Sequence, residues 1–76
     1  MILNSKYYEK VECPVCGNSV FSKAEFPGSY VICPICGWED DDLQYYEPSY
    51  EGGANQVSLN KARENYKKYG SSDPSS

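Results

Sequence analysis

Apolar positions follow helical spacing toward the end of the chain. Four residues at spacings of three, four and three share one face of the expected helix: Leu59, Ala62, Tyr66 and Tyr69. Ser58 suits the N-cap before this stripe, and Gly70 suits the left-handed residue that ends it. The pattern therefore predicts a helix from the Ser58 cap through Tyr69. Because a helix of about a dozen residues is marginal alone, its apolar face must dock on the rest of the domain.

Residues rich in β-formers lie earlier in the chain. Val20 and Phe21 form one short run, and residues 30–32 form a second. Pro27 and Gly28 between them are a strong turn signal. The pattern predicts a β-hairpin that pairs these two runs. One cysteine-containing turn would precede its first strand, and the other would follow its second.

An acidic run and a glycine pair separate these regions from the last helix. The run consists of Glu39, Asp40, Asp41 and Asp42. We expect a solvated acidic turn in which an Asp caps a short helical turn over residues 43–47, ended by Pro48. A calcium site is disfavoured because the run lacks the alternation and the glycine of a calcium loop. The glycines at residues 52–53 lack the context of a phosphate loop, and they indicate positive φ or close backbone approach.

The cysteines form a short internal repeat. Cys13-Pro14-Val15-Cys16-Gly17 is repeated as Cys33-Pro34-Ile35-Cys36-Gly37, with the spacing C-x2-C-x16-C-x2-C. This spacing is typical of two thiolate pairs around one ion, and the glycine after each second cysteine lets N–H groups approach the sulfurs. Two disulfides or four inert thiols are disfavoured alternatives. We therefore expect a metal site with four ligands: Cys13, Cys16, Cys33 and Cys36.

Four thiolates suit either zinc or iron. We expect one zinc ion per chain, with iron as the alternative. A shell of four sulfurs leaves zinc no open position, so the zinc is expected to be structural. The paired turns also resemble those of rubredoxins, which are electron carriers with one iron held by four cysteines beside aromatic residues. Zinc is favoured because the interval between the turns is shorter than in rubredoxins. In addition, Asn18-Ser19-Val20 stands where they carry a tyrosine.

Composition explains why a metal would matter. The chain has 76 residues, of which Leu, Ile, Val and Phe make up about 17%, a content typical of chains that do not fold alone. Eight tyrosines and Trp38 add further apolar surface. Histidine is missing, which removes the commonest general base, so we expect a protein that is not an enzyme. No signal peptide or long apolar run occurs, which predicts a cytoplasmic location without membrane association.

These observations predict one small metal-stabilised α+β domain over residues 7–70. Its class is zinc-ribbon or rubredoxin-like, with a β-hairpin, two Cys-Pro-x-Cys-Gly knuckles and a C-terminal helix. Residues 71–76 have the composition of a flexible tail.

Two longer blocks carry a more specific resemblance. Residues 27–41 (PGSYVICPICGWEDD) and 52–66 (GGANQVSLNKARENY) resemble the bacterial cysteine-rich CPCC family, and the similarity spans about residues 11–70. The sequence departs from the family at Val15, where the family has an extra cysteine, and at Gly37, where a larger residue is common. The resemblance implies that Cys13 and Cys16 are the matching ligands of a zinc-ribbon-like domain. It implies no reaction.

Charge narrows the expected partners. The net charge is -4, and the basic side chains of the last helix, Lys61, Arg63, Lys67 and Lys68, do not share one stripe. The overall acidity disfavours nucleic acid as a partner. We expect a protein-interaction module whose contact surfaces are the acidic run and a tyrosine-rich face. The alternatives are a rubredoxin-like electron carrier, an immunity or antitoxin protein that covers a basic toxin, and a nucleic-acid-binding zinc ribbon.

Tyrosines are expected to play two roles. Most should pack the last helix onto the ribbon with their hydroxyls at the rim. An exposed remainder that includes Tyr7, Tyr8 or Tyr46 would be the place for a partner.

Overall fold

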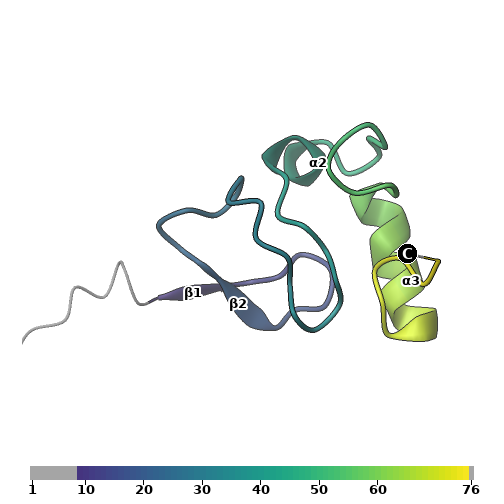
Figure 1. Cartoon of the computed structure of the whole chain (residues 1–76), viewed down its shortest axis with the longest axis horizontal. Coiled ribbons are helices and arrows are strands. Elements are labelled where there is room, and N and C mark those ends of the chain that lie inside the picture. Colours follow the sequence, from purple (N-terminus) through teal and green to yellow (C-terminus); the bar gives the residue numbers. More distant parts are fainter. Residues whose placement is uncertain (1–8, 76) are drawn as a thin grey trace, which may run out of the picture.

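The computed structural model describes residues 9–75 of the chain. Figure 1 shows a hairpin of β1 (Lys10–Glu12) and β2 (Ser19–Ser22) toward one end of the molecule and α3 (Leu59–Tyr69) toward the other. The short helix α2 (Asp42–Tyr46) lies above them. The expected α+β class is thus confirmed at this level. Neither of these helices has the length and apolar character needed to cross a membrane.

The strands do not pair as the sequence predicted. β2 contains Val20 and Phe21, but its antiparallel partner is β1, with Val11 opposite Phe21. Residues 30–32 instead run beside residues 38–40, where Ile32 and Glu39 form an isolated antiparallel bridge. The predicted hairpin is therefore wrong. The first cysteine turn connects β1 to β2, whereas the second connects residues 30–32 to residues 38–40, which share one isolated bridge.

The short helix α2 lies within one residue of its predicted position. It begins after Asp41, whose carboxylate accepts hydrogen bonds from the N–H groups of Leu43 and Gln44. This side chain satisfies N–H groups that have no partner inside the helix. The predicted cap is therefore confirmed, and it fixes the direction in which the chain leaves the second cysteine turn.

Both ends of α3 are confirmed as predicted. Ser58 Oγ accepts a hydrogen bond from the Lys61 N–H at 3.1 Å. At the other end Gly70 has a φ of 74°, and its N–H donates to the Tyr66 C=O. A left-handed residue costs glycine little, which explains why the helix ends there.

The buried face of α3 differs from the predicted stripe at one end. Leu59 and Ala62 are buried, and Tyr66 is half-buried against the core. Tyr69 is 63% exposed, so its assignment to the docking face is wrong, and Asn65 is buried instead. The reason is that Asn65 Nδ2 donates to the Ser72 C=O at 2.9 Å, where the chain turns back along the helix.

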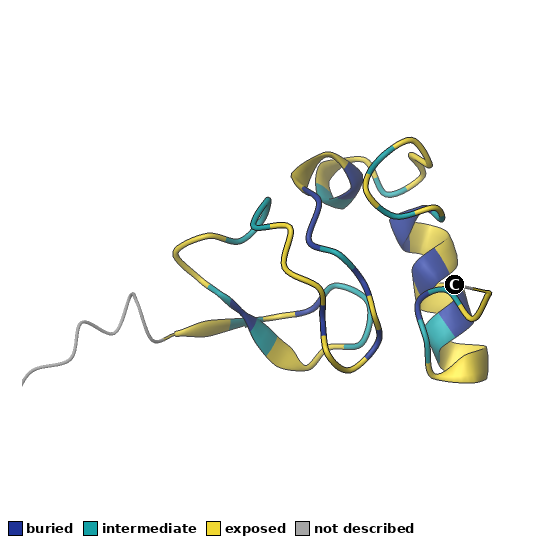
Figure 2. Cartoon of the chain, in the orientation of Figure 1, coloured by how far each residue is buried: buried dark blue, intermediate teal, exposed yellow. Residues whose placement is uncertain are grey.

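The core is small and includes three of the cysteines. Its buried hydrophobic residues are Cys13, Phe21, Cys33, Cys36, Trp38, Leu59 and Ala62. Figure 2 shows the buried positions as short stretches on the hairpin, on the second cysteine turn and on one side of α3. The interior therefore lies where these three parts meet, and the cysteine cluster is itself a component of it.

Two residues of the acidic run lie inside the molecule. Asp40 Oδ2 accepts from the N–H groups of Gly28 and Ser29 at 3.1 and 2.9 Å, and from Ser29 Oγ at 2.7 Å. Asp41 Oδ2 accepts from the Ala54 N–H at 2.7 Å. Asp40 is 1% and Asp41 is 4% exposed. The predicted solvated turn is therefore wrong for these two residues, because their carboxylates take the place of water on backbone N–H groups of two loops.

Gln44 holds the loop that precedes α3. Its Nε2 donates to the C=O groups of Tyr50, Asn55 and Val57 at 3.1, 3.2 and 3.0 Å. Its Oε1 accepts from the Asn55 N–H and from Asn55 Nδ2 at 3.0 and 2.9 Å. The side chain is fully buried. Because five hydrogen bonds converge on one buried amide, this side chain fixes the path of residues 50–57.

Gly53 packs closely against this buried amide. A Cβ added to Gly53 would lie 2.7 Å from Gln44 Cγ and still closer to Asp41 Oδ2, and both contacts are closer than non-bonded atoms approach. The expectation of close backbone approach at the glycine pair is confirmed at this position.

Tyrosines contribute less to the core than predicted. Tyr45 and Tyr66 pack against it, whereas four others are exposed: Tyr30, Tyr46, Tyr50 and Tyr69. The Tyr45 ring contacts the Phe26 ring edge-on, with centroids 5.0 Å apart. Tyr7 and Tyr8 lie outside the described residues. The prediction that most tyrosines pack the last helix is wrong, since Leu59 and Ala62 supply that contact.

Part of the predicted tail packs against the second cysteine turn. The Ser72 N–H donates to the Cys36 C=O at 2.8 Å, and Ser72 is only 4% exposed. The chain after Gly70 therefore returns to the second cysteine turn, which its Ser-rich composition does not indicate.

Candidate metal centre

The four cysteines meet at one point in the structure. Their Sγ atoms all lie within 4.8 Å of one another. The Sγ atoms of Cys13 and Cys36 are 3.6 Å apart, and those of Cys16 and Cys33 are 3.7 Å apart. Each of these close pairs joins the first turn to the second. The structure thus brings together all four residues that the sequence predicted as ligands.

The two turns that carry the cysteines have the same backbone hydrogen bonds. In the first, the Cys13 N–H donates to the Asn18 C=O at 2.8 Å and the Gly17 N–H donates to the Cys13 C=O at 2.9 Å. In the second, the Cys33 N–H donates to the Trp38 C=O at 2.8 Å and the Gly37 N–H donates to the Cys33 C=O at 2.9 Å. Both glycines have positive φ, 82° and 90°. The repeated pentapeptide therefore encodes one turn conformation twice, and glycine is needed where the chain curls back.

Backbone N–H groups are directed at the first cysteine of each turn. The Ile35 N–H lies 3.4 Å from Cys33 Sγ. At Cys13, hydrogen bonds from the Cys36 thiol and then from the backbone of Cys16 and Val15 lower the pKa to about 5. Such donors stabilise a thiolate, which is the form of cysteine that binds metal.

The cysteine thiols of the second turn, Cys33 and Cys36, lose their protons less readily. Burial raises the pKa of Cys33 above its usual value. The hydrogen bond that Cys36 donates to Cys13, together with burial, raises the pKa of Cys36. Without a cation the two cysteines of the second turn therefore keep their protons, because burial and the hydrogen bond from Cys36 to Cys13 favour the neutral thiols. A dication at the centre would instead favour the thiolates.

The sulfur geometry fits a tetrahedral metal ion. Sulfurs at the usual zinc–sulfur distance of about 2.3 Å form a tetrahedron with edges of about 3.8 Å. The closest pairs, at 3.6 and 3.7 Å, match these edges. The same separations are far longer than the sulfur–sulfur bond of about 2.05 Å in a disulfide, and the four cysteines are free. The residues present therefore fit a single ion of the zinc or iron type.

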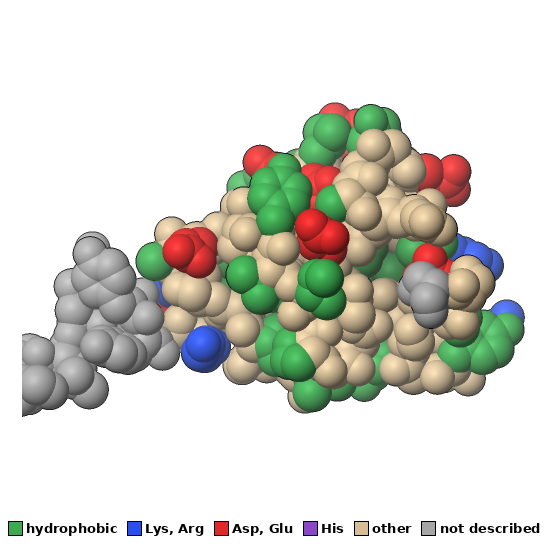
Figure 3. Space-filling view, viewed as in Figure 1, with side chains coloured by type: hydrophobic (Ala, Val, Ile, Leu, Met, Phe, Trp, Pro, Cys, Tyr) green, Lys and Arg blue, Asp and Glu red, His purple; other side chains and the backbone are tan. Residues whose placement is uncertain are grey.

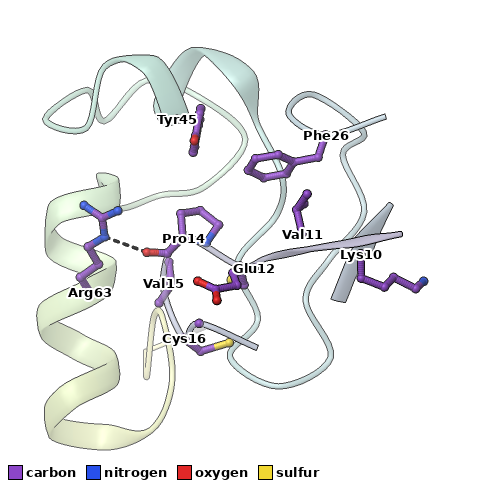
Figure 4. Close-up of a pocket in the computed structure, with 11 residues that line it drawn as sticks. Lys10, Val11, Glu12, Pro14, Val15, Cys16, Phe26, Tyr45 and Arg63 are labelled. Carbon is purple, nitrogen blue, oxygen red and sulfur yellow. Dashed lines mark hydrogen bonds between the residues drawn. The ribbon is translucent and has the colours of Figure 1, made fainter. Parts of the chain in front are cut away.

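Cys16 is the most accessible of the four cysteines. Cys16 is half-buried, whereas the other three cysteines are buried. A groove of about 760 Å³ borders the first turn and is lined in part by Val11, Cys16, Phe26 and Tyr45. Figure 4 shows these side chains around the groove, which separates the hairpin from α2 and α3.

Two residues near the centre were not predicted as part of it. Asn18 Nδ2 lies 3.2 Å from Cys16 Sγ and donates to it, which supports the most exposed sulfur. Arg63 Nε donates to the Pro14 C=O at 2.7 Å and joins α3 to the first turn (Figure 4). The sequence signal for Asn18 was its place next to the turn glycine. No local sequence pattern indicates the bond of Arg63 to a residue so distant in sequence.

The sequence comparisons agree with this geometry. A comparison with curated proteins finds no match. A family model described as cysteine-rich CPCC matches residues 11–76, a span that contains all but the first residue of the hairpin, all four cysteines and α3. This match confirms the resemblance seen in the sequence, and the chain belongs to the cysteine-rich CPCC family.

Proposed function

We propose that the protein is a zinc-stabilised protein-interaction module in which the zinc ion is structural. The observation that carries this proposal is the cluster of four free Sγ atoms within 4.8 Å of one another, three of them on buried residues. Four thiolates complete a tetrahedral zinc shell and leave no coordination position for water or substrate. The ion then supplies folding free energy, not chemistry. Free thiols of this kind belong to a reducing compartment, and we place the protein in the cytoplasm.

Exposed apolar side chains support the interaction role. Among residues 9–75, eight large hydrophobic residues are exposed: Tyr30, Val31, Ile32, Ile35, Leu43, Tyr46, Tyr50 and Tyr69. Several of them are consecutive or nearly so, and clustered apolar exposure on a small domain marks a contact surface. Of the two contact surfaces expected from the sequence, the acidic run does not provide one through Asp40 and Asp41, which are buried.

Two measurements test the proposal. Elemental analysis of protein purified without added metal should find one zinc ion per chain, and a folded protein without metal would contradict it. Affinity capture from source cells should recover a partner with the zinc-loaded protein and lose it with Cys33→Ser, which lacks one ligand. A repeated capture that yields no protein able to rebind in purified form would refute the interaction role.

A rubredoxin-like electron carrier is the second candidate. Cys16 is half-buried beside an open groove, so one sulfur of the centre lies near solvent, where an electron can enter or leave. The N–H directed at Cys33 Sγ stabilises sulfur charge in either oxidation state of an iron site. This candidate requires iron in the purified protein, visible absorption and a reversible one-electron couple. Stoichiometric zinc without redox activity would eliminate it.

A further inference from the structure

The segment that enters the second cysteine turn, residues 30–32, has exposed side chains throughout. Tyr30, Val31 and Ile32 are 53%, 49% and 58% exposed, and Ile35 at the tip of the turn is 52% exposed. Tyr30 has a φ of 60°, so the extended part begins after it with Val31 and Ile32. The side chains of these two successive residues point to opposite faces, and both are exposed, so neither face is covered there. Figure 3 shows hydrophobic side chains over this part of the molecule with acidic side chains beside them.

The backbone of this segment has one paired edge and one open edge. The Cys33 N–H donates to the Trp38 C=O at 2.8 Å, and the Asp40 N–H donates to the Val31 C=O at 3.0 Å. These bonds flank Ile32 and make it the non-hydrogen-bonded partner of Glu39. The N–H and C=O of Ile32 therefore point away from Glu39, and they have no hydrogen-bond partner among residues 9–75. An exposed strand edge of this kind is a template for another strand.

The charge around this edge is of one sign. Residues 24–60 contain seven acidic side chains and no Lys or Arg. Glu39 lies opposite Ile32, and the Tyr30 hydroxyl donates to the Asp42 carboxylate at 3.4 Å. The carboxylates of Asp42 and Asp41 raise the pKa of the Tyr30 hydroxyl, so this group stays neutral and the local field stays negative. A second copy of the chain would bring two such fields together, whereas a basic segment would complement one.

We propose that residues 30–32 and Ile35 form a docking site for an extended segment of a partner protein in which apolar and basic residues alternate. The partner adds a strand to the open edge at Ile32, its apolar side chains contact those of Ile32 and Ile35, and its basic side chains face Glu39 and Asp42. Backbone pairing supplies affinity in this mode, and the alternating side chains supply selectivity. The inference deepens the proposed function and rests on it.

A labelled, capped peptide of alternating lysine and valine tests the site against zinc-loaded protein. Fluorescence anisotropy should show binding at low salt that weakens at high salt, and a glutamate–valine peptide should not bind. Amide hydrogen exchange followed by NMR should show the Ile32 N–H becoming protected when the peptide is added. Ile32→Ser should weaken binding about tenfold by loss of apolar contact, whereas the matched control Tyr69→Ser should leave it within about twofold.

N-methylated peptides distinguish binding by backbone pairing from binding by charge attraction alone. One version carries N-methyl groups on every valine and the other on every lysine, so that each blocks one edge of the extended peptide. One of the two should bind about tenfold more weakly through lost hydrogen bonds. Equal binding of both, or Ile32→Ser binding as well as Tyr69→Ser, overturns the strand addition. Chain dimerisation through this edge also overturns it.

The outcome is distinguishable from failure of the proposed function. Absence of peptide binding overturns this docking site whatever affinity capture finds. A captured partner that binds Ile32→Ser as well as wild type would support the interaction module and overturn this surface. If capture finds no partner, the module proposal fails even where the peptide binds.

Discussion

Removal of the metal should unfold the domain. Apart from the three cysteines, its buried hydrophobic residues are Phe21, Trp38, Leu59 and Ala62. Full burial of each of the three larger side chains contributes about 1.5–3 kcal/mol before the cost of ordering the chain. A structural zinc ion contributes about 10–16 kcal/mol of apparent binding free energy, against about 5 kcal/mol of net stability for a small domain. The loss of the ion therefore exceeds the whole stability margin.

The experiment follows one protein sample through removal and return of zinc. Far-UV circular dichroism should lose the helical signal when a strong chelator is added. The fluorescence of Trp38, which is fully buried in the folded protein, should shift to the red as the side chain reaches water. Stoichiometric zinc added after the chelator is removed should restore both signals, which excludes irreversible damage as the cause.

One result would refute this reasoning directly. If the metal-free protein keeps its helical signal and an emission typical of buried Trp38, the ordinary apolar contacts are sufficient for folding. The metal would then have a role other than stability, and the structural assignment of the ion would fall with it. Cys33→Ser provides an independent test, since it removes one ligand without a chelator and should give an unfolded or much less stable chain.

Three further outcomes are expected. Gln44→Glu should destabilise the zinc-loaded protein by about 2–4 kcal/mol in urea unfolding, because the new carboxylate would face the backbone C=O groups to which Gln44 now donates. The matched control is Gln56→Glu, on an exposed side chain, and equal stabilities of the two variants would contradict the buried network. Gly53→Ala should lower the stability of the folded protein by about 1–3 kcal/mol through overpacking against the Gln44 side chain. Gly52→Ala should lower it less, because its nearest contacts are with the Tyr50 side chain. The reverse order of melting temperatures would show the contact at Gly53 to be wrong. Zinc affinity measured by competition should fall about a hundredfold or more for each unit of pH below 7. The raised pKa values of the two cysteines in the second turn keep them protonated, so zinc must displace these protons. An affinity independent of pH would exclude four-thiolate binding.

Local chemistry is what the sequence predicts well. The cysteine spacing identified the four residues that meet, and the helix caps at Asp41, Ser58 and Gly70 are confirmed, because each depends on a few neighbouring residues. Close approach at Gly53 was predicted for a similar reason, although its partner in space was not.

Contacts between distant residues were the source of the errors. Pairing of residues 30–32 with residues 38–40 competes with the predicted hairpin, and β-propensity does not choose between partners. Asp40 is buried because N–H groups of Gly28 and Ser29 converge on it, which no rule on charged runs anticipates. Ser72 is fixed by Cys36 and Asn65, although its own neighbours are typical of a frayed end.

Two pairs of segments, the hairpin β1–β2 and the bridged residues 30–32 with residues 38–40, are joined without a shared ladder. In the part of the chain that the structure describes, no backbone hydrogen bond connects residues 9–22 with residues 30–40. Sulfur atoms from both pairs meet at the centre instead, so a bound ion acts as a crosslink whose angles set the orientation of one pair against the other. The connecting residues 23–29 therefore do not set the alignment of one pair relative to the other. Relatives in which this connection is longer or shorter are expected to keep the same four-sulfur geometry.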